Sequence, residues 1–324
     1  MPAPTSSTTT LQRADLGALA YEYYMDASQR GFIGTEIMPI FEVAEQSADY
    51  PVIPVEALIK LPASIRRAKR GKYQRGDYEF ETGTYSCEEY GWEEPVDDSE
   101  ANLYRRYFDA EEVAVKRAVD IILRNQEKRI ATAVQSTGNI TNTAAVSTEW
   151  STAATCTPKA DVKGGIQALR AATGLEPNAM AISKKVFENL LICAELKDYL
   201  QYTNPHLMSN MEAQKAMVAQ YLGLEKVLVG DAVYDSAKKN KSMSIADIWD
   251  DEYALLFRMS SNTNDLRDPI LGRSFLWTAD SPDNLTTEEY REEQTRSTIY
   301  RVRHHVDEAF VFTGAGYLLS NITA

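Results

Sequence analysis

The sequence has few residues of the kinds that form disulfide frameworks and metal centres. It contains three cysteines, Cys87, Cys156 and Cys193, and three histidines, His206, His304 and His305. The cysteine spacings match neither a disulfide scaffold nor a zinc site, so reduced thiols are expected. His304 and His305 fall in a predicted strand, where adjacent side chains point to opposite faces and cannot share a metal. All three histidines are therefore interpreted as structural residues.

Sequence motifs of enzymes are also missing. There is no phosphate loop of the form GxxxxGKS or GxxxxGKT, no HExxH zinc motif and no GxSxG nucleophile elbow. Gly314 and Gly316 match half of a dinucleotide-binding fingerprint, but its third glycine is absent and no βαβ unit is predicted after them. We therefore expect no enzymatic activity, no cofactor and no metal. An α+β hydrolase with a lid ribbon is a distant alternative, because no nucleophile and base support it.

Long apolar runs and an excess of positive charge are absent as well. No segment approaches the roughly 18 apolar residues of a membrane span, and the opening stretch MPAPTSSTTT lacks the apolar centre of a signal peptide. We therefore expect a protein made in the cytosol that does not contact a membrane. The net charge of −13 disfavours a nucleic-acid-binding protein, whose affinity comes largely from Lys and Arg on phosphates.

The charges that are present separate into two neighbouring blocks. Residues 60–75 hold seven basic residues and no acid, namely Lys60, Arg66, Arg67, Lys69, Arg70, Lys72 and Arg75. Residues 77–100 hold ten acids and no basic residue. The basic block could dock on an acidic surface of another copy, bind nucleic acid with Tyr73 as a stacking ring, or be a solvated hairpin end. The acidic block favours docking, because each copy then carries both halves of a complementary contact.

The most distinctive predicted element is one helix over residues 98–135, which contain neither Pro nor Gly. Asp98 or Ser99 offers an N-cap, and basic residues gather near the end. At about 1.5 Å per residue the helix would run roughly 55 Å. One face is charged, so the helix should lie on a surface. The opposite, apolar stripe comprises Tyr104, Tyr107, Phe108, Val115, Ala118, Val119, Ile122, Ile130 and Val134.

The segments before this helix predict an arm and a ribbon. Residues 1–10 are expected to be disordered or extended, 11–28 helical, and 32–43 an extended arm with Pro39. Residues 47–97 predict a long two-stranded ribbon with a basic tip and almost no apolar core. Such a ribbon is marginal in water, so it should gain stability on another surface.

The segments after the helix predict a mixed α+β body. Helices are expected over 159–173, after a cap at Ser183, and from a capping box at Ser209 and Glu212 to Gly223. Residues 230–247 are expected to form a polar loop. Strands are expected over 177–182, 226–229, 253–258, 274–278, 295–304 and 306–312.

This order of arm, ribbon, long helix and α+β body resembles the major capsid proteins of tailed bacteriophages. The stretches EPNAMAISKKVFENLL, KVLVGDAVYD and IWDDEYALLF are similar to segments of that family. The resemblance implies an α+β fold with an N-terminal arm (1–46), an extended E-loop (47–97), a P-domain (98–160) with a spine helix (98–135), an A-domain (161–295) and a return through the P-domain (296–324).

The resemblance also implies a function. The chain would be a non-enzymatic subunit that self-assembles, through a procapsid, as hexamers and pentamers into an icosahedral head. That head would hold double-stranded DNA without sequence-specific contact, and an acidic lining suits this. A separate scaffolding protein, a portal and a decoration protein are implied partners. A lysine of the E-loop is crosslinked in some relatives; Lys60, Lys69 and Lys72 are available, but no asparagine or acid partner is identified. A nanocompartment shell that packages a cargo enzyme, and a tail or portal component, stay as alternatives.

Overall fold

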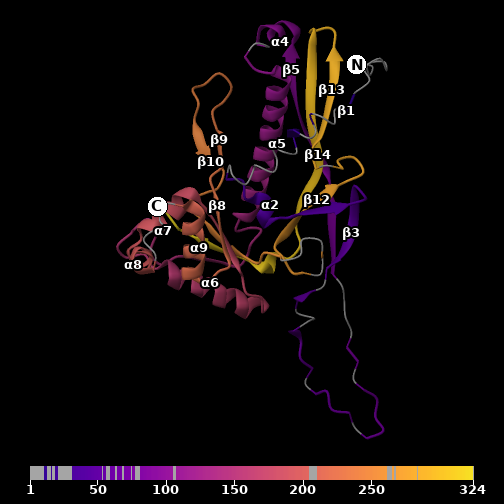
Figure 1. Cartoon of the computed structure of the whole chain (residues 1–324). Coiled ribbons are helices and arrows are strands. Elements are labelled where there is room, and N and C mark those ends of the chain that lie inside the picture. The colour runs from indigo at the N-terminus through magenta and orange to yellow at the C-terminus, as the bar shows by residue number, and fades with distance from the viewer. Residues whose placement is uncertain are drawn as a thin grey trace.

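The computed structural model describes residues 11–12, 16, 19–20, 31–52, 54–55, 59–62, 64–67, 69–73, 75–76, 81–104, 107–203, 210–260, 265, 268–282 and 284–323. They form an elongated molecule with a sheet and a long helix in one half, helices around a second sheet in the other, and a long projecting loop (Figure 1). Residues 1–10, predicted to be disordered, lie outside the described residues, as does most of the helix predicted over 11–28. Leu11–Gln12 begin that segment as a strand, β1.

A six-stranded sheet forms the first half. Its strand order is β1-β13-β14-β12-β2, and β5 pairs with the other edge of β14. The strands are β2 Ile40–Val43, β5 Glu88–Asp97, β12 Gly272–Trp277, β13 Thr286–Glu292 and β14 Ser297–Phe310. The two closing strands predicted over 295–304 and 306–312 are the single strand β14, because neither Gly nor Pro interrupts the stretch between them.

A long helix crosses this sheet, but it is shorter than predicted. The segment 98–135 divides into α4 (Asp98–Tyr104) and α5 (Ala110–Val134), and α5 packs on β5 and β14. The side chain of Asp109 caps α5 by accepting from the N–H of Glu111 at 3.0 Å, so the cap is neither Asp98 nor Ser99. At about 1.5 Å per residue, α5 spans roughly 37 Å. Within the described part of the chain, no helix has the length and apolar character of a membrane span.

The helix breaks where its apolar stripe has nothing beneath it. From Val115 onward the predicted stripe is buried, and Val115, Ile130 and Val134 belong to the core. Tyr104, Tyr107 and Phe108 are exposed instead. Most helical stability in proteins comes from packing of the apolar face, so a helix without a surface to cover ends easily.

The N-terminal arm reaches this sheet at its edge. A one-turn helix, α2 (Gly34–Ile37), precedes Pro39 and β2, which pairs in parallel with β12. The sequence predicted an extended arm over 32–43. The strand is at an edge, as Pro39 indicated, but the helical turn was not predicted.

A five-stranded sheet with helices around it forms the second half. The strand order is β6-β15-β11-β7-β8, with β6 Thr143–Ala145, β7 Ala179–Ser183, β8 Lys226–Gly230, β11 Ala254–Phe257 and β15 Gly316–Ser320. The helices are α6 Pro158–Thr173, α7 Lys184–Ile192, α8 Ala194–Thr203 and α9 Met211–Leu222. Gly174 ends α6 and Gly223 ends α9 in the left-handed conformation, and Ser183 caps α7, as predicted.

Two predictions for this half were wrong. Asn210 caps α9, with its side chain accepting from the N–H of Glu212 at 3.0 Å, whereas Ser209 lies outside the described residues. The polar loop predicted over 230–247 contains a hairpin, β9 (Val233–Asp235) paired with β10 (Ile245–Asp247). Its strands are three residues long, too short for a clear alternating pattern in the sequence.

The cysteines also differ from expectation. Cys156 and Cys193 form a disulfide within the core of the second half, and Cys87 is free and buried. The sequence predicted three reduced thiols. A separation of 37 residues carries no sign that two cysteines meet, because only the fold brings the loop before α6 onto the loop before α8.

Candidate intersubunit docking surface

The projecting loop has a firmly held base. Strands β3 (Ser47–Val52) and β4 (Glu81–Ser86) pair antiparallel, and the rings of Tyr50 and Tyr85 lie 5.2 and 4.7 Å from that of Phe275 on β12. The N–H of Ser86 donates to the carboxylate of Asp307 on β14 at 2.8 Å. The predicted ribbon over 47–97 therefore ends at Ser86, because β5 leaves it to join β14.

Beyond this base the loop leaves the body of the molecule (Figure 1). Leu61, Ile65 and Tyr73 are 90%, 83% and 72% exposed. Soluble proteins do carry single exposed apolar residues, but three on one projecting loop are typical of a surface that another molecule covers.

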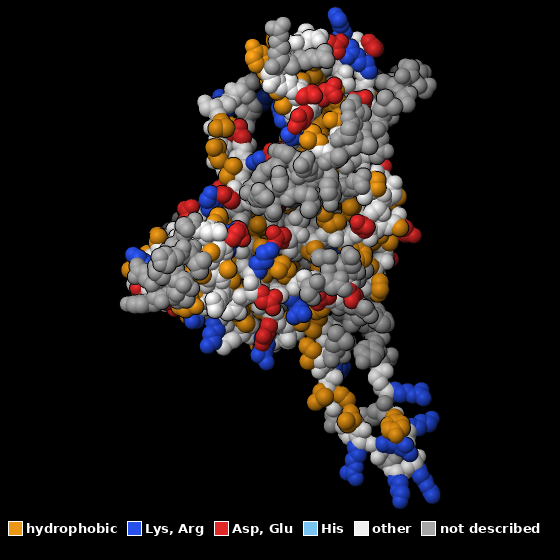
Figure 2. Space-filling view, in the orientation of Figure 1, with side chains coloured by type: hydrophobic (Ala, Val, Ile, Leu, Met, Phe, Trp, Pro, Cys, Tyr) orange, Lys and Arg blue, Asp and Glu red, His pale blue; other side chains and the backbone are white. Residues whose placement is uncertain are grey.

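The far end of the loop carries the cations that the sequence singled out. Arg66, Arg67, Lys69, Arg70, Lys72 and Arg75 are all exposed. Figure 2 shows these basic side chains spread around the end of the loop. The guanidinium of Arg67 lies 4.9 Å from the ring centre of Tyr73, and Arg70 forms a turn with φ of +72°. None of the six forms an ion pair with an acid in the described part of the chain, so their charge faces outward. We call these six side chains the basic tip.

The acidic block lies elsewhere, and part of it is already paired. Asp98 binds Arg291 at 2.6 Å, which lowers the pKa of that carboxyl, and Glu94 lies 3.7 Å from Arg117. Glu93 lies 3.7 Å from Arg301. These arginines are on α5, β13 and β14, most of them about 200 residues further along the chain. Glu81, Glu88 and Glu100 are exposed and have no ion pair with a described residue.

A buried carboxylate holds the platform that carries the loop. Glu127 in the middle of α5 accepts from the N–H groups of Ile33 and Gly34 in the arm, each at 2.8 Å. It also accepts from the indole N–H of Trp249, in the loop after β10, at 2.7 Å. A Cβ on Gly34 would lie 2.6 Å from the Glu127 carboxylate, so a larger residue there would have to displace this carboxylate. This junction was not predictable from the sequence, because a single Glu on a charged helix is expected to be solvated.

The electrostatics of Glu127 are set by its burial. Loss of solvent raises the pKa of its carboxyl from 4.5 to about 7, although the three N–H donors act in the opposite direction. Glu36 on α2 is the nearby charge that raises it further, and Glu36 is itself paired with Lys226. One side chain thus joins the arm, the long helix and the second half of the molecule.

Metal binding or catalysis in the rest of the described structure would require a suitable group of side chains. No group of three His, Cys, Asp or Glu side chains is placed to hold a metal ion within the described residues. His304 is buried, which lowers its pKa to about 3, and His305 binds Asp280 through Nδ1 at 2.7 Å. The two side chains point to opposite faces of β14, where His304 lies near Arg129 of α5. His206 lies outside the described residues.

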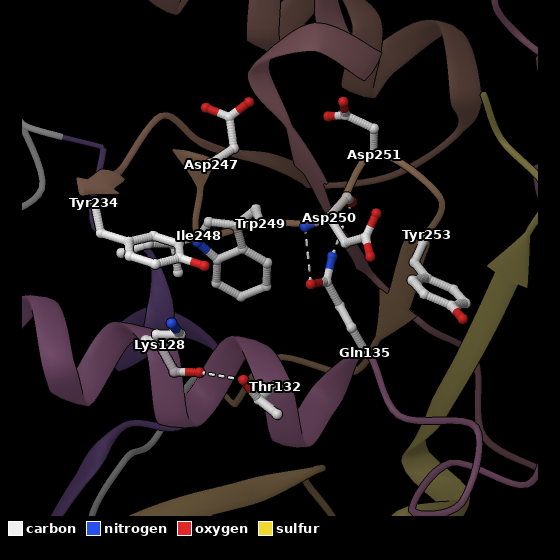
Figure 3. A pocket seen from close by; sticks show the side chains of 10 residues that line it. All are labelled: Lys128, Thr132, Gln135, Tyr234, Asp247, Ile248, Trp249, Asp250, Asp251 and Tyr253. Carbon is white, nitrogen blue, oxygen red and sulfur yellow. Dashed lines mark hydrogen bonds between the residues drawn. The ribbon is translucent and has the colours of Figure 1, made fainter. Parts of the chain in front are cut away.

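A hollow of about 490 Å³ lies between α5 and the loop after β10 (Figure 3). Gln135 binds both the N–H and the C=O of Asp250, at 3.0 and 3.1 Å. Aromatic side chains, aspartates, Lys128, Thr132 and Ile248 line the rest. No side chain among them pairs a nucleophile with a base, so the hollow suggests no reaction.

Comparisons with known proteins give a consistent answer. No family model matches the sequence. The sequence is 26% identical over 225 residues to the major capsid protein of Burkholderia phage BcepMu. The aligned region covers 67% of this chain and 68% of that protein. A phage-related protein from Bordetella bronchiseptica superposes with a TM-score of 0.71 at 19% identity, covering 97% of this chain and 98% of that one. A chain in the capsid of Cyanophage P-SCSP1u gives 0.55 at 9% identity, covering 88% and 86%.

This is the fold of tailed-phage capsid subunits. A ribbon leaves a sheet, a long helix lies across that sheet, and a separate α+β unit follows. The α+β class and the resemblance found in the sequence are confirmed. The sequence relative and the full-length structural match together make this chain similar to phage major capsid proteins in sequence and in fold.

Proposed function

We propose that this chain is the major subunit of the icosahedral head of a tailed phage. It assembles as hexamers and pentamers into a closed shell around double-stranded DNA. Its role is structural. The capsid function printed for the phage relative supports this assignment over a nanocompartment shell that packages a cargo enzyme.

The observation that carries the proposal is the projecting loop. Its base is fixed to the sheet by Tyr50, Tyr85 and Ser86, whereas its end exposes apolar and cationic side chains together. A ribbon of this kind gains stability when a neighbour covers it. In this account the basic tip docks on an adjacent copy, and Arg66, Arg67, Lys69, Arg70, Lys72 and Arg75 supply the contact.

The domains, the net charge and the assembly partners are interpreted on the same proposal of a capsid subunit. The domains are the arm (1–46), the E-loop (47–97), the P-domain (98–160), the A-domain (161–295) and the return (296–324), with β5 joining the P-domain sheet. A net charge of −13 suits a shell that must hold DNA without binding it tightly. The subunit is made in the host cytoplasm, and assembly there uses a scaffolding protein and a portal, with a decoration protein added outside.

Assembly is tested by expressing the chain, separating it by size-exclusion chromatography and imaging the large fraction by negative stain. Closed shells, or sheets of five- and six-membered rings, are expected, with nuclease-sensitive density inside if DNA is the content. A protein that stays monomeric alone is tested again with a phage scaffolding protein. A single closed ring would instead indicate a portal or tail component, and a dimer that never assembles would contradict the shell.

A further inference from the structure

The hairpin β9–β10 projects from the body as a second, shorter ribbon (Figure 1). Its end exposes Met243 and Ile245, at 71% and 64%. Lys238, Lys239 and Lys241 are exposed in the loop of the same hairpin, and none of the three forms an ion pair with a described residue. The hairpin thus repeats, on a smaller scale, the combination of apolar and basic side chains found on the E-loop.

The hairpin is held in place by hydrogen bonds across its loop and by contacts at its base. Asp235 accepts from the N–H groups of Ala237 and Ser244, each at 2.9 Å, which closes the ribbon across its loop. At the base, the Lys128 ammonium lies 3.7 Å from the ring centre of Tyr234, and Arg124 donates to the carbonyl of Val233. A projecting element that is ordered before it has a partner loses little entropy on binding.

A surface of the opposite character lies where α4 meets α5. Leu103, Tyr104, Tyr107, Phe108 and Val113 are all exposed there. The rings of Tyr104 and Phe108 stack at 5.2 Å, and a hollow of about 390 Å³ opens beside Val113 on α5. We call these five residues the α4–α5 corner. Five large apolar residues within eleven positions form a patch of the kind that marks an interaction site.

The segment that carries this corner is rich in acids, although Asp98 and Glu112 already pair with Arg291 and Lys116. Residues 98–113 contain five acids and two arginines, a net charge of −3, whereas residues 236–245 contain three lysines and no acid. Two copies of the corner would repel each other, and two copies of the hairpin would do the same. The complementary pairing is hairpin to corner.

We propose that the β9–β10 hairpin of one subunit docks on the α4–α5 corner of a neighbouring copy. In the view of Figure 1 both elements lie toward the end of the molecule opposite the tip of the E-loop, so subunits standing side by side bring them to a similar level. Because hairpin and corner are different surfaces, the contact is head to tail, which is the kind of contact that joins subunits around a ring. This inference rests on the proposed shell function and adds a contact that does not use the E-loop.

A disulfide trap tests the contact. The variant Met243→Cys with Tyr107→Cys is assembled and oxidised, and the particle fraction is run on a non-reducing gel. A ladder of covalently linked subunits is expected, because the two thiols come from different chains. The matched control pairs Met243→Cys with Glu88→Cys, which lies on exposed β5, and should give no ladder. The native cysteines do not interfere, since Cys87 is buried and the others are bonded to each other.

The oxidation rate of Met243 in the unmodified protein gives a second measurement. Exposed Met243 should react readily with a dilute peroxide in free subunits, and at least about tenfold more slowly in particles. Particles that form with no ladder and no protection of Met243 would overturn this contact while leaving the shell function intact. An equal ladder from the Glu88→Cys control would overturn it too. The absence of particles under all conditions would count against the shell itself.

Discussion

Replacing Arg66, Arg67 and Arg70 together by glutamate is expected to leave a folded subunit that forms at least tenfold fewer shells. The three side chains are exposed and form no ion pair with a described acid, so their removal does not disturb the subunit itself. Reversal changes the tip by six units of charge and turns attraction for an acidic neighbour into repulsion. Circular dichroism of the subunit and the yield of particles by light scattering provide the two readouts.

Replacing the same three arginines by lysine provides the matched control, because it keeps both position and charge. Shell yield from this variant should stay within about twofold of the parent. Salt provides an independent check. At 1 M salt the screening length falls to about 3 Å and exposed ion pairs weaken, so the parent chain should also form fewer shells. Normal shells from the glutamate variant would remove the basic tip from the account, while the family assignment would stand.

Replacing Glu127 by leucine is expected to lower the free energy of unfolding of the subunit by about 3 kcal/mol. The N–H groups of Ile33, Gly34 and Trp249 lose this acceptor, and an unsatisfied buried donor costs about 1–3 kcal/mol. Equilibrium urea denaturation at pH 6 measures the difference. Replacing Glu36 by glutamine provides the control, because Glu36 lies in α2 of the arm and is partly exposed. This change should lower the free energy of unfolding by less than about 1 kcal/mol. Equal losses from the two variants would contradict the junction.

The same carboxylate should make stability depend on pH. Burial raises the pKa of Glu127 from 4.5 to about 7, so the folded state binds this proton more tightly than the unfolded chain does. Its contribution is therefore complete below about pH 4.5 and is lost as pH rises to about 7, by about 3 kcal/mol in all. Replacing Glu127 by glutamine removes this contribution. The difference in stability between parent and variant should change across that window; a constant difference would contradict the assignment.

Local chemistry made much of this fold predictable from the sequence. Gly174 and Gly223 mark helix ends because they adopt left-handed backbone, and Ser183 marks a helix start because its hydroxyl accepts a backbone N–H. The alternating and buried strands around Ala179 and Leu255 follow from hydrophobic patterning. The stretch from Lys60 to Arg75, with seven basic residues and no acid, also indicated an exposed loop end, and its six cations from Arg66 to Arg75 are exposed.

Features that depend on distant contacts were not predictable. The acids of residues 77–100 looked like a free surface, but Arg291 and Arg301, about 200 residues away, pair with Asp98 and Glu93. Glu127 looked solvated, and its three donors come from segments about 90 residues before it and about 120 after it. The long helix begins only after Asp109, because no core underlies Tyr107 and Phe108, and the pattern of a helix cannot show what lies beneath it.

The most direct test of the account is a cryo-electron microscopy reconstruction of the assembled particle in which residues 59–76 are traced. The account predicts an icosahedral shell in which the basic tip and the apolar side chains of Leu61, Ile65 and Tyr73 contact an adjacent subunit. A shell in which this loop folds back on its own subunit, or extends into solvent without a neighbour, would contradict it.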